Sequence, residues 1–229
     1  MQEIQAIIRE REKIDKDLFF LPIEKITSDS PYTIIKRNKR LGIIKDDMVI
    51  VSPIYDNVRL LVNNYAILEI ENAVACYDLV TQLFVTTFEY HHILCVNNYL
   101  KVYKDSNLCG IFDLVEKKQI VRCGLYEDFN LKDRNTKYMW AKYDKYFHFI
   151  NKHTGKIIRL QGISMAYDTP FLMMGKDERD TVSVYNEEGR QDLLLLRRIV
   201  QKEGGYMTLY NYTYNIQHLI DINGNVLNI

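Results

Sequence analysis

Few side chains in this 229-residue chain stand in a pattern that could do chemistry. The nearest approach to a metal-binding group is the pair His91 and His92 beside Cys95. In a strand, alternate side chains point to opposite faces, so His91 and Cys95 would share one face while His92 takes the other. The two histidines are therefore badly placed to chelate one ion together, and we expect no metal site.

The cysteines give a second possible site. They lie at Cys76, Cys95, Cys109 and Cys123, with no C-x-x-C pair and no tight cluster with histidine. This spacing argues against zinc and favours reduced, partly buried thiols. One alternative stays open: in a hairpin with a three-residue loop at 115–117, Cys109 and Cys123 would face each other. A disulfide there would imply an oxidising compartment.

Catalytic patterns are missing from the sequence. We find no paired carboxylates, no nucleophile with a base and no phosphate-cradling glycine loop at a recognised spacing. We therefore expect no enzyme, no catalytic residue and no cofactor. The basic run at 36–40, "KRNKR", could grip phosphate, but we favour a charged hairpin tip that discourages strand pairing.

The overall charge excludes further classes of partner. Thirty Lys and Arg balance thirty Asp and Glu, so no net field attracts nucleic acid or an anionic membrane. Residues 1–17 carry charges where a signal peptide needs an apolar run. No stretch approaches the roughly 18 apolar residues of a membrane span. We expect a cytoplasmic protein with neither a nucleic-acid nor a membrane partner.

The elements that would position any site repeat along the chain. "VNNY" occurs at 62–65 and again at 96–99. A turn, an aromatic residue and an alternating strand recur every 33 to 39 residues, with the aromatic at Tyr32, Tyr65, Tyr99, Tyr138, Phe171 and Tyr206. A polar residue that ends a later strand keeps the same spacing, at Lys45, Asp78, Asp113, Asn151, Asn186 and Asp221. Two agreeing series predict six repeated units.

Each unit reads as short antiparallel strands joined by tight turns. Asn63 with Asn64, and Asn97 with Asn98, suit primed turns because asparagine reaches positive φ at low cost. One face of the strand after each aromatic is apolar, which predicts core residues at Ala66, Leu68, Ile70, Leu100, Val102, Met139, Ala141, Leu172, Met174, Met207 and Leu209. The aromatics point the other way and would pack between neighbouring units.

These patterns predict an all-β, β-propeller-like fold with an N-terminal helix. Residues 1–17 form an amphipathic helix, and 18–229 form a single β-repeat domain with units starting near 32, 65, 99, 138, 171 and 206. The helix carries Ile4, Ile7, Ile8 and Ile14 on one side, and we favour capping of the β array over docking onto a partner. Residues 18–26 could complete the last unit and close a ring of six. The alternative is an open superhelical array.

Several stretches resemble WG repeats, in which a Gly-aromatic-Ile-Asp strand precedes a Gly-Lys turn, an apolar strand and Pro with Tyr-Asp. They are "SPIYD" at 52–56, "GIFD" at 110–113, "INKHTGKII" at 150–158 and "IDINGNV" at 220–226. The resemblance runs from about Tyr32 to the end, although no Trp-Gly dipeptide occurs and Trp140 lies in a different strand. It implies a bacterial interaction module without a catalytic residue set, such as an immunity protein that neutralises a toxin.

Two stretches are candidate binding surfaces. Residues 127–137, "EDFNLKDRNTK", stand where other units have a two-residue turn, and repeat proteins often bind through such insertions. The strand "YMTLYNYTY" at 206–214 puts tyrosines on one face, where we favour inter-unit packing although tyrosine also suits binding. The candidate binding residues are Glu127, Asp128, Asn130, Lys132, Asp133, Arg134, Trp140, Tyr206, Tyr210 and Tyr212.

The sequence thus favours a non-enzymatic module that binds another protein, in its narrowest form an immunity or inhibitor-type protein that acts by blockade. The alternative is a carbohydrate-binding or glycoside-acting protein, in which Trp140 and the tyrosines would stack on sugar rings. A structural scaffold is a third reading.

Overall fold

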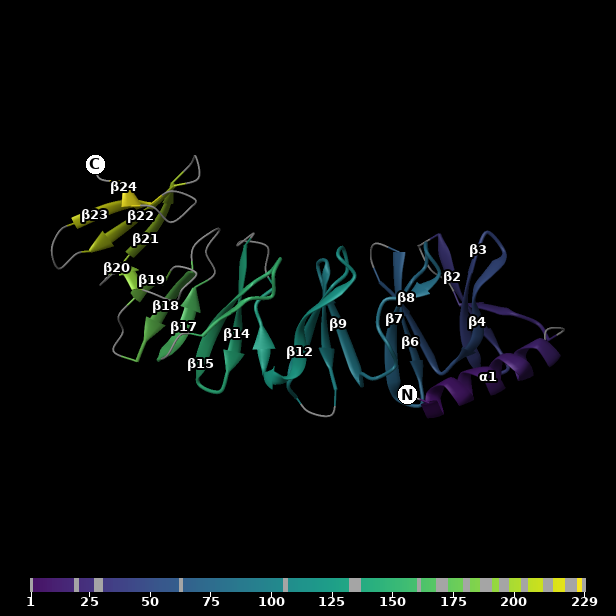
Figure 1. Ribbon diagram of the computed structural model, residues 1–229. Coiled ribbons are helices and arrows are strands. Elements are labelled where there is room, and N and C mark those ends of the chain that lie inside the picture. The colour runs from purple at the N-terminus through teal and green to yellow at the C-terminus, as the bar shows by residue number, and fades with distance from the viewer. Residues whose placement is uncertain are drawn as a thin grey trace. The chain divides into compact units, whose positions relative to one another are not determined.

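The computed structural model describes most of the chain (Figure 1). The described residues are 2–229 except 19–20, 27–30, 62–63, 105–106, 132–136, 160–161, 168–172, 179–181, 186–190, 194–197, 203–205, 212–215, 221–225 and 228–229. Side chains are described up to residue 185, except those of 167, 182 and 184 in addition to the gaps above.

Within the described residues the chain forms one helix and six four-stranded antiparallel sheets, each with its strands in chain order. The helix is α1 (Gln2–Asp17). The first sheet holds β1 (Glu24–Ile26), β2 (Tyr32–Arg37), β3 (Arg40–Lys45) and β4 (Met48–Tyr55), and the second holds β5 (Asn57–Leu60), β6 (Tyr65–Ile70), β7 (Ala73–Asp78) and β8 (Leu83–Phe84). The third holds β9 (His92–Val96), β10 (Tyr99–Tyr103), β11 (Cys109–Asp113) and β12 (Lys118–Tyr126), and the fourth holds β13 (Asp128–Phe129), β14 (Tyr138–Tyr143), β15 (Tyr146–Asn151) and β16 (Ile157–Ile158). The fifth holds β17 (Ile163–Tyr167), β18 (Met173–Asp177), β19 (Val182–Tyr185) and β20 (Gln191–Leu193), and the sixth holds β21 (Arg198–Lys202), β22 (Tyr206–Asn211), β23 (Ile216–Ile220) and β24 (Val226–Leu227). The predicted fold class is confirmed: an all-β, propeller-like series of meanders with an N-terminal helix.

The sheets begin one strand earlier than the repeat aromatics suggest. Val96 of β9 pairs with Tyr99 of β10, so the strand before the aromatic opens the new sheet. At the N-terminus Ile26 of β1 pairs with Ile34 of β2. The expectation that residues 18–26 complete the last unit is therefore wrong. The sixth sheet takes its first strand, β21, from the residues just before Tyr206 and needs none from the N-terminus.

The chain divides into two compact units, residues 1–107 with 114–117 and residues 108–113 with 118–229. The cysteines in them are all free thiols. Cys109 pairs in register with Tyr126 because two irregularities shift β12 along β11, so the alternative of a Cys109–Cys123 disulfide is wrong. No helix in the part of the chain that the structure describes is long and apolar enough to cross a membrane.

The two repeating series are the two partners of one cross-strand rung. Tyr65 pairs with Asp78, as Tyr32 pairs with Lys45 and Tyr138 with Asn151. Their spacings agree because one geometry sets both. The residue after the polar partner then donates its N–H to the carbonyl just before the aromatic, at 2.9 Å in each of three sheets: Leu79 to Asn64, Leu114 to Asn98 and Lys152 to Lys137.

Of the two copies of "VNNY", the structure describes the second in full and the first only in part. In the second copy Val96 pairs with Tyr99 and Asn97 has a φ of 54°, which confirms a two-residue turn with positive φ. In the first copy Leu61 donates its N–H to the Tyr65 carbonyl, and Asn64 carries the positive φ of 64°. Residues 62 and 63, and with Asn63 half of the turn predicted there, lie outside the described residues.

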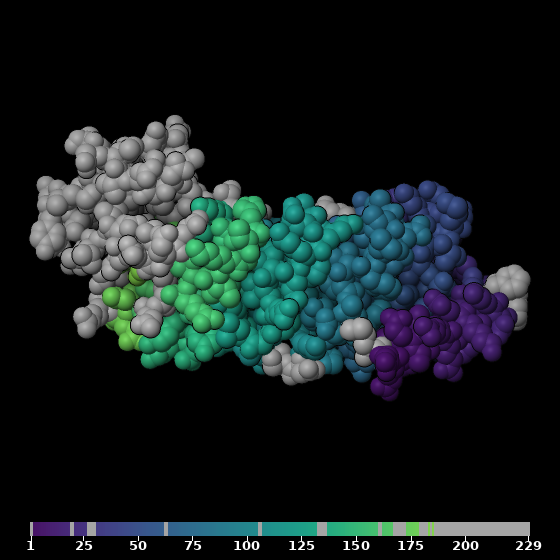
Figure 2. Space-filling view, in the orientation of Figure 1, coloured from purple at the N-terminus to yellow at the C-terminus, as the bar shows by residue number. Residues whose placement is uncertain are grey.

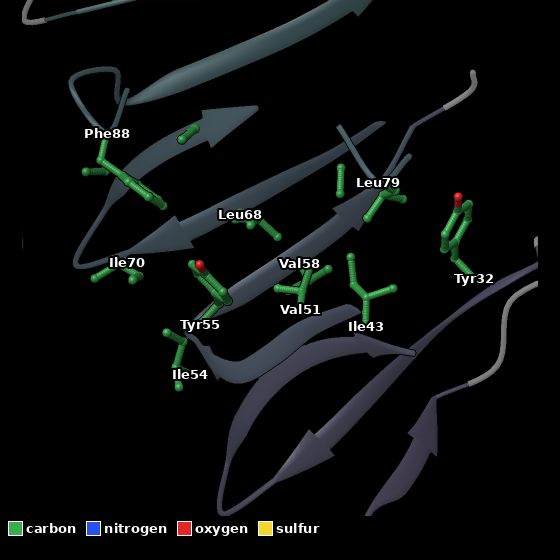
Figure 3. Packing of buried hydrophobic residues seen from close by; sticks show 13 residues of the cluster. Tyr32, Ile43, Val51, Ile54, Tyr55, Val58, Leu68, Ile70, Leu79 and Phe88 are labelled. Carbon is green, nitrogen blue, oxygen red and sulfur yellow. The ribbon is translucent and has the colours of Figure 1, made fainter. Parts of the chain in front are cut away.

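The core of the first unit lies between the first two sheets (Figure 3). It contains Tyr32, Ile43, Val51, Ile54, Tyr55, Val58, Ala66, Leu68, Ile70, Ala73, Ala75, Leu79 and Phe88. Core positions predicted from alternation are confirmed at Ala66, Leu68, Ile70, Leu100, Val102, Met139, Ala141 and Met174. Leu172 and the side chains of Met207 and Leu209 lie outside the described part.

Three of the six repeat aromatics have contacts that fit the predicted packing between neighbouring units, while Phe171 and the Tyr206 side chain lie outside the described part. Tyr32 belongs to the core of the first unit, and Tyr138 packs with Phe149 in the second unit. The Tyr65 hydroxyl donates to the Leu114 carbonyl at 3.2 Å, which ties the second sheet to the next repeat. These aromatics are structural.

Helix α1 caps the first two sheets, as Figures 1 and 2 show. Ile4, Ile7 and Ile8 pack against the core of the first unit. Arg11 donates to the Ile54 carbonyl at 3.1 Å and fixes the helix to β4. Ile14, the fourth residue of the predicted apolar stripe, is 45% exposed. Capping is thus confirmed, with one isoleucine left uncovered.

Candidate functional site

The segment 127–137 is not an inserted loop from end to end. Asp128 and Phe129 form β13, which pairs with Lys142 and Ala141 of β14 and opens the fourth sheet. Phe129 is buried because its side chain turns inward to Tyr126, whose ring centroid lies 5.3 Å away. The expectation that the whole segment replaces a turn is wrong, since part of it supplies a strand.

The polar residues of this segment lie around β13. Glu127 accepts a bond of 2.6 Å from Lys142 Nζ, and Asp128 Oδ1 accepts the N–H of Phe129 at 2.8 Å. Both acids are exposed. The backbone N–H of Asn130 bonds to the Trp140 carbonyl. Lys132, Asp133 and Arg134 lie outside the described residues.

The candidate tryptophan and the candidate tyrosine strand lie in different sheets. Trp140 is half-buried, and its ring meets Phe147 edge-on at 5.0 Å in the packing of the fourth sheet. Tyr206 and Tyr210 lie on β22 of the sixth sheet, paired with Lys202 and Arg198. Their side chains, and Tyr212 altogether, lie outside the described part. Glu127, Asp128 and Trp140 thus share a sheet that the tyrosine strand does not join.

The structure shows a surface that the sequence reasoning missed. In the first three sheets, exposed apolar side chains occur in the turn between the third and fourth strands or at the start of the fourth strand, all within the first unit. Their exposed fractions run from 48% to 67%. We call this set the apolar turn surface: Met48, Val49, Val80, Leu83 and Val115. The sequence contains a pattern that could have indicated this surface: "DLV" occurs at both 78–80 and 113–115.

Within "DLV" the leucine and the valine have opposite environments. Leu79 and Leu114 are buried, and Leu79 belongs to the core of the first unit (Figure 3). Val80 and Val115 follow directly and are 65% and 67% exposed. The buried leucine anchors each turn, so the exposed valine is held at a defined place on a rigid base.

Asp78 positions two of these turns together. Its Oδ1 accepts the N–H groups of Val80 and Thr81 at 2.9 and 3.2 Å, which shapes the first turn. Its Oδ2 accepts Lys117 Nζ at 2.7 Å, from the turn that carries Val115. One carboxylate therefore joins the turns that present Val80 and Val115.

The same turn recurs in the fourth sheet with a different surface. Asn151 Oδ1 accepts the N–H groups of His153 and Thr154 at 2.9 and 3.0 Å, as Asp78 does for its own turn. The residue at the valine position is the exposed His153. The second and fourth sheets thus share the turn, while the exposed valine of the second is a histidine in the fourth.

The histidine pair is not organised for metal. His91 Nδ1 lies 3.3 Å from the Asn72 carbonyl oxygen, while the His92 ring packs against Tyr103 at 5.7 Å. Among the residues that the structure describes, no three His, Cys, Asp or Glu side chains are grouped to hold a metal ion.

Comparison with known proteins leaves the family open. No protein-family model and no curated protein matches the chain. Solved structures match at low similarity. The computationally designed Ika8 protein has 9% identity and a TM-score of 0.33 over 88% of this chain and 72% of its own. Hsv2 from Kluyveromyces lactis has 13% identity and a TM-score of 0.33, over 88% of this chain and 75% of its own. BamB from Moraxella catarrhalis has 13% identity and a TM-score of 0.29, over 90% of this chain and 72% of its own. Similarity this low supports no inference about function.

Replacing Asp78 by Asn should lower stability at neutral pH by about 1 kcal/mol. Burial acts to raise the pKa of Asp78, but hydrogen bonds from Lys117 and from the Thr81 and Val80 amides outweigh it and lower the pKa to about 2. A lowered carboxyl pKa stabilises the fold above the unfolded value of 3.8, and this contribution is lost as pH falls through about 2.

Urea unfolding at pH 6, 4 and 2 tests this. The difference in free energy of unfolding between wild type and Asp78→Asn should be largest at pH 6 and small at pH 2. Asp47→Asn is the matched control, because its 2.7 Å pair with Lys25 is solvent-exposed and should contribute little. A gap that does not change with pH would contradict the role of the ionised carboxylate.

Proposed function

We propose that the protein is a non-enzymatic binding module that presents the apolar turn surface to another protein. The main observation in support is that exposed apolar side chains recur, in each of three successive repeats, in or directly after the turn between the third and fourth strands. Single exposed apolar residues are ordinary on any protein. Here Val80 and Val115 each stand two residues after an aspartate, and Met48 and Leu83 each begin a fourth strand. With Asp78 joining two of the turns, this recurrence is the pattern of a contact surface.

The surroundings of these side chains suit a protein partner. Charged residues flank the apolar positions: Asp46 and Asp47 precede Met48, and Glu116 with Lys117 follow Val115. Protein interfaces commonly combine an apolar centre with a polar rim. The buried leucines hold the turns before any partner arrives, which lowers the entropy cost of binding.

In its narrower form the proposal is an immunity or inhibitor-type protein that acts by blockade. A rigid β surface can cover a partner's site without chemistry of its own. The exposed carboxylates of Glu127 and Asp128 offer a second, acidic contact in the fourth sheet, where the sequence placed the candidate site. The carbohydrate alternative gains no support, because the Trp140 ring is engaged with Phe147.

Aspartate substitutions on the apolar turn surface should abolish partner capture. Val80→Asp combined with Val115→Asp places two charges where apolar contact is needed, and we expect retention of the partner to fall at least about tenfold. Tagged protein recovered from its native host, with bound proteins quantified by mass spectrometry, provides the measurement. Thermal unfolding should stay nearly unchanged because both positions are exposed.

Two controls sharpen the result. Leu94→Asp changes an apolar side chain that is 38% exposed on β9, away from these turns, and should leave capture intact. Glu127→Gln with Asp128→Asn tests the acidic contact separately. A partner held equally by wild type and by the double valine variant would refute the proposed surface.

A further inference from the structure

A cavity of about 640 Å³ lies in the first unit between α1, the tip of the β2–β3 hairpin, β4 and the β6–β7 turn. This volume falls within the roughly 300 to 1,000 Å³ usual for small-molecule sites. The protein-binding proposal makes no use of it. We infer that the cavity binds a small molecule with one oxyanion group, a carboxylate or a phosphate, on an apolar body.

The apolar wall of the cavity explains the uncovered isoleucine of the helix. Ile14 and Leu18 of α1 line it together with Pro53 and Ile54 of β4. Ile14 lies on the apolar stripe of the helix yet remains 45% exposed, because at this point the helix faces the cavity instead of a packed side chain. An apolar ligand body would cover it.

The opposite wall carries the basic run. Arg37, Lys39 and Arg40 line the cavity from the β2–β3 hairpin. The predicted hairpin tip is confirmed, since Arg37 pairs with Arg40 across a two-residue turn with positive φ at Asn38 and Lys39. The charges of this tip therefore face the cavity as well as solvent. This position is consistent with the alternative that residues 36–40 bind phosphate.

Arg37 carries the strongest evidence for an anion. Its side chain is only 9% exposed, and Nη1 lies 3.1 Å from Asp15 Oδ1. Its buried Nε has no hydrogen-bond partner among the described residues. A buried donor left unpaired costs about 1 to 3 kcal/mol. The planar guanidinium is suited to binding carboxylate or phosphate oxygens through two donors at once, so an oxyanion is the ligand that this group fits best.

The acids around the cavity are mostly committed to other cations. Glu71 accepts Arg11 Nη2 at 2.5 Å, and Asp56, behind the wall, pairs with both Arg11 and Arg40. Four cations (Arg11, Arg37, Lys39, Arg40) and three acids (Glu10, Asp15, Glu71) line the wall, and Asp56 behind it makes the charges equal. An oxyanion would therefore be held by the basic side chains of the β2–β3 hairpin and not by a net charge of the wall.

Binding of octanoate and of octyl phosphate, followed by calorimetry and by thermal unfolding, tests this inference. Both probes combine an oxyanion with an apolar chain, and the comparison shows which anion the site prefers. Inorganic phosphate lacks the chain and should bind at least about tenfold more weakly. Wild-type protein should show one site and a higher melting temperature with either long-chain probe.

Variants on both walls should weaken that binding. Arg37→Gln should reduce affinity at least about tenfold through the anion. Ile14→Asp should do the same through the chain, and it keeps the test valid if Arg37→Gln unfolds, because Ile14 is exposed. Lys13→Gln removes a charge on the exposed side of the same helix and should bind like wild type. Absence of binding by both long-chain probes, or equal binding by wild type and Ile14→Asp, would overturn the inference.

Discussion

Replacing Gly42 with alanine is expected to destabilise the protein by about 3 kcal/mol, a large effect for one added methyl group. A Cβ at this position would lie 2.5 Å from the Val51 carbonyl oxygen and 2.7 Å from the Pro53 nitrogen. Both are backbone atoms of β4, which cannot step aside as a flexible side chain can. The register shift between Leu41 and Ile43 marks the irregularity where β4 comes this close.

The second sheet carries alanine at the position equivalent to Gly42. Ala75 stands three residues before Asp78, as Gly42 stands three before Lys45. There β8 pairs in register only with Tyr77 and Asp78. The residues after β8 still contact β7, where Val85 donates its N–H to the Cys76 carbonyl and Tyr90 forms a bridge with Val74.

Urea unfolding monitored by circular dichroism gives the comparison. Gly124→Ala is the control, because a Cβ there meets no atom within 4 Å, although its φ of 112° strains alanine. It should cost about 1 to 2 kcal/mol from backbone strain alone. A Gly42→Ala protein no less stable than Gly124→Ala would show that the close approach to β4 is not a constraint.

Removing residues 1–17 is expected to cost the first unit about 4 kcal/mol and to lower its melting temperature by about 16 °C. The deletion uncovers the part of the core on which Ile4, Ile7 and Ile8 pack. It also removes Arg11, which bonds to the Ile54 carbonyl and to Asp56. The helix is thus part of the fold of this unit.

A substitution on the same helix provides the control for the deletion. Ile14→Asp should change the melting temperature little, since that side chain is already exposed. If the shortened protein melts at the wild-type temperature, α1 is not a structural cap, and docking onto a partner becomes the better account of its apolar stripe.

The repeat could be predicted from sequence because cross-strand pairing leaves a periodic trace. Tyr65 and Asp78 recur at matched spacing since they occupy one rung of the ladder. The division into sheets could not be predicted in the same way. The strand before each aromatic alternates like the strand after it, so the pattern alone does not say which sheet His92–Val96 joins.

The candidate site was harder to predict because it depends on which way individual side chains turn. In "DLV" two apolar residues follow one acid, and composition gives no reason to bury Leu79 and expose Val80. The outcome depends on the bonds that Asp78 accepts from the turn. In "EDFNL" the inward turn of Phe129 converts an apparent insertion into a strand.

Photo-crosslinking in the native host tests the central claim most directly. A photoreactive amino acid placed at Val80 or at Val115 would lie on the apolar turn surface, and one placed at Leu94 would lie outside it. We predict a discrete crosslinked product with the same partner protein from positions 80 and 115, and none from position 94. Products from position 94 alone, or none from either turn, would contradict the proposal that this surface binds another protein.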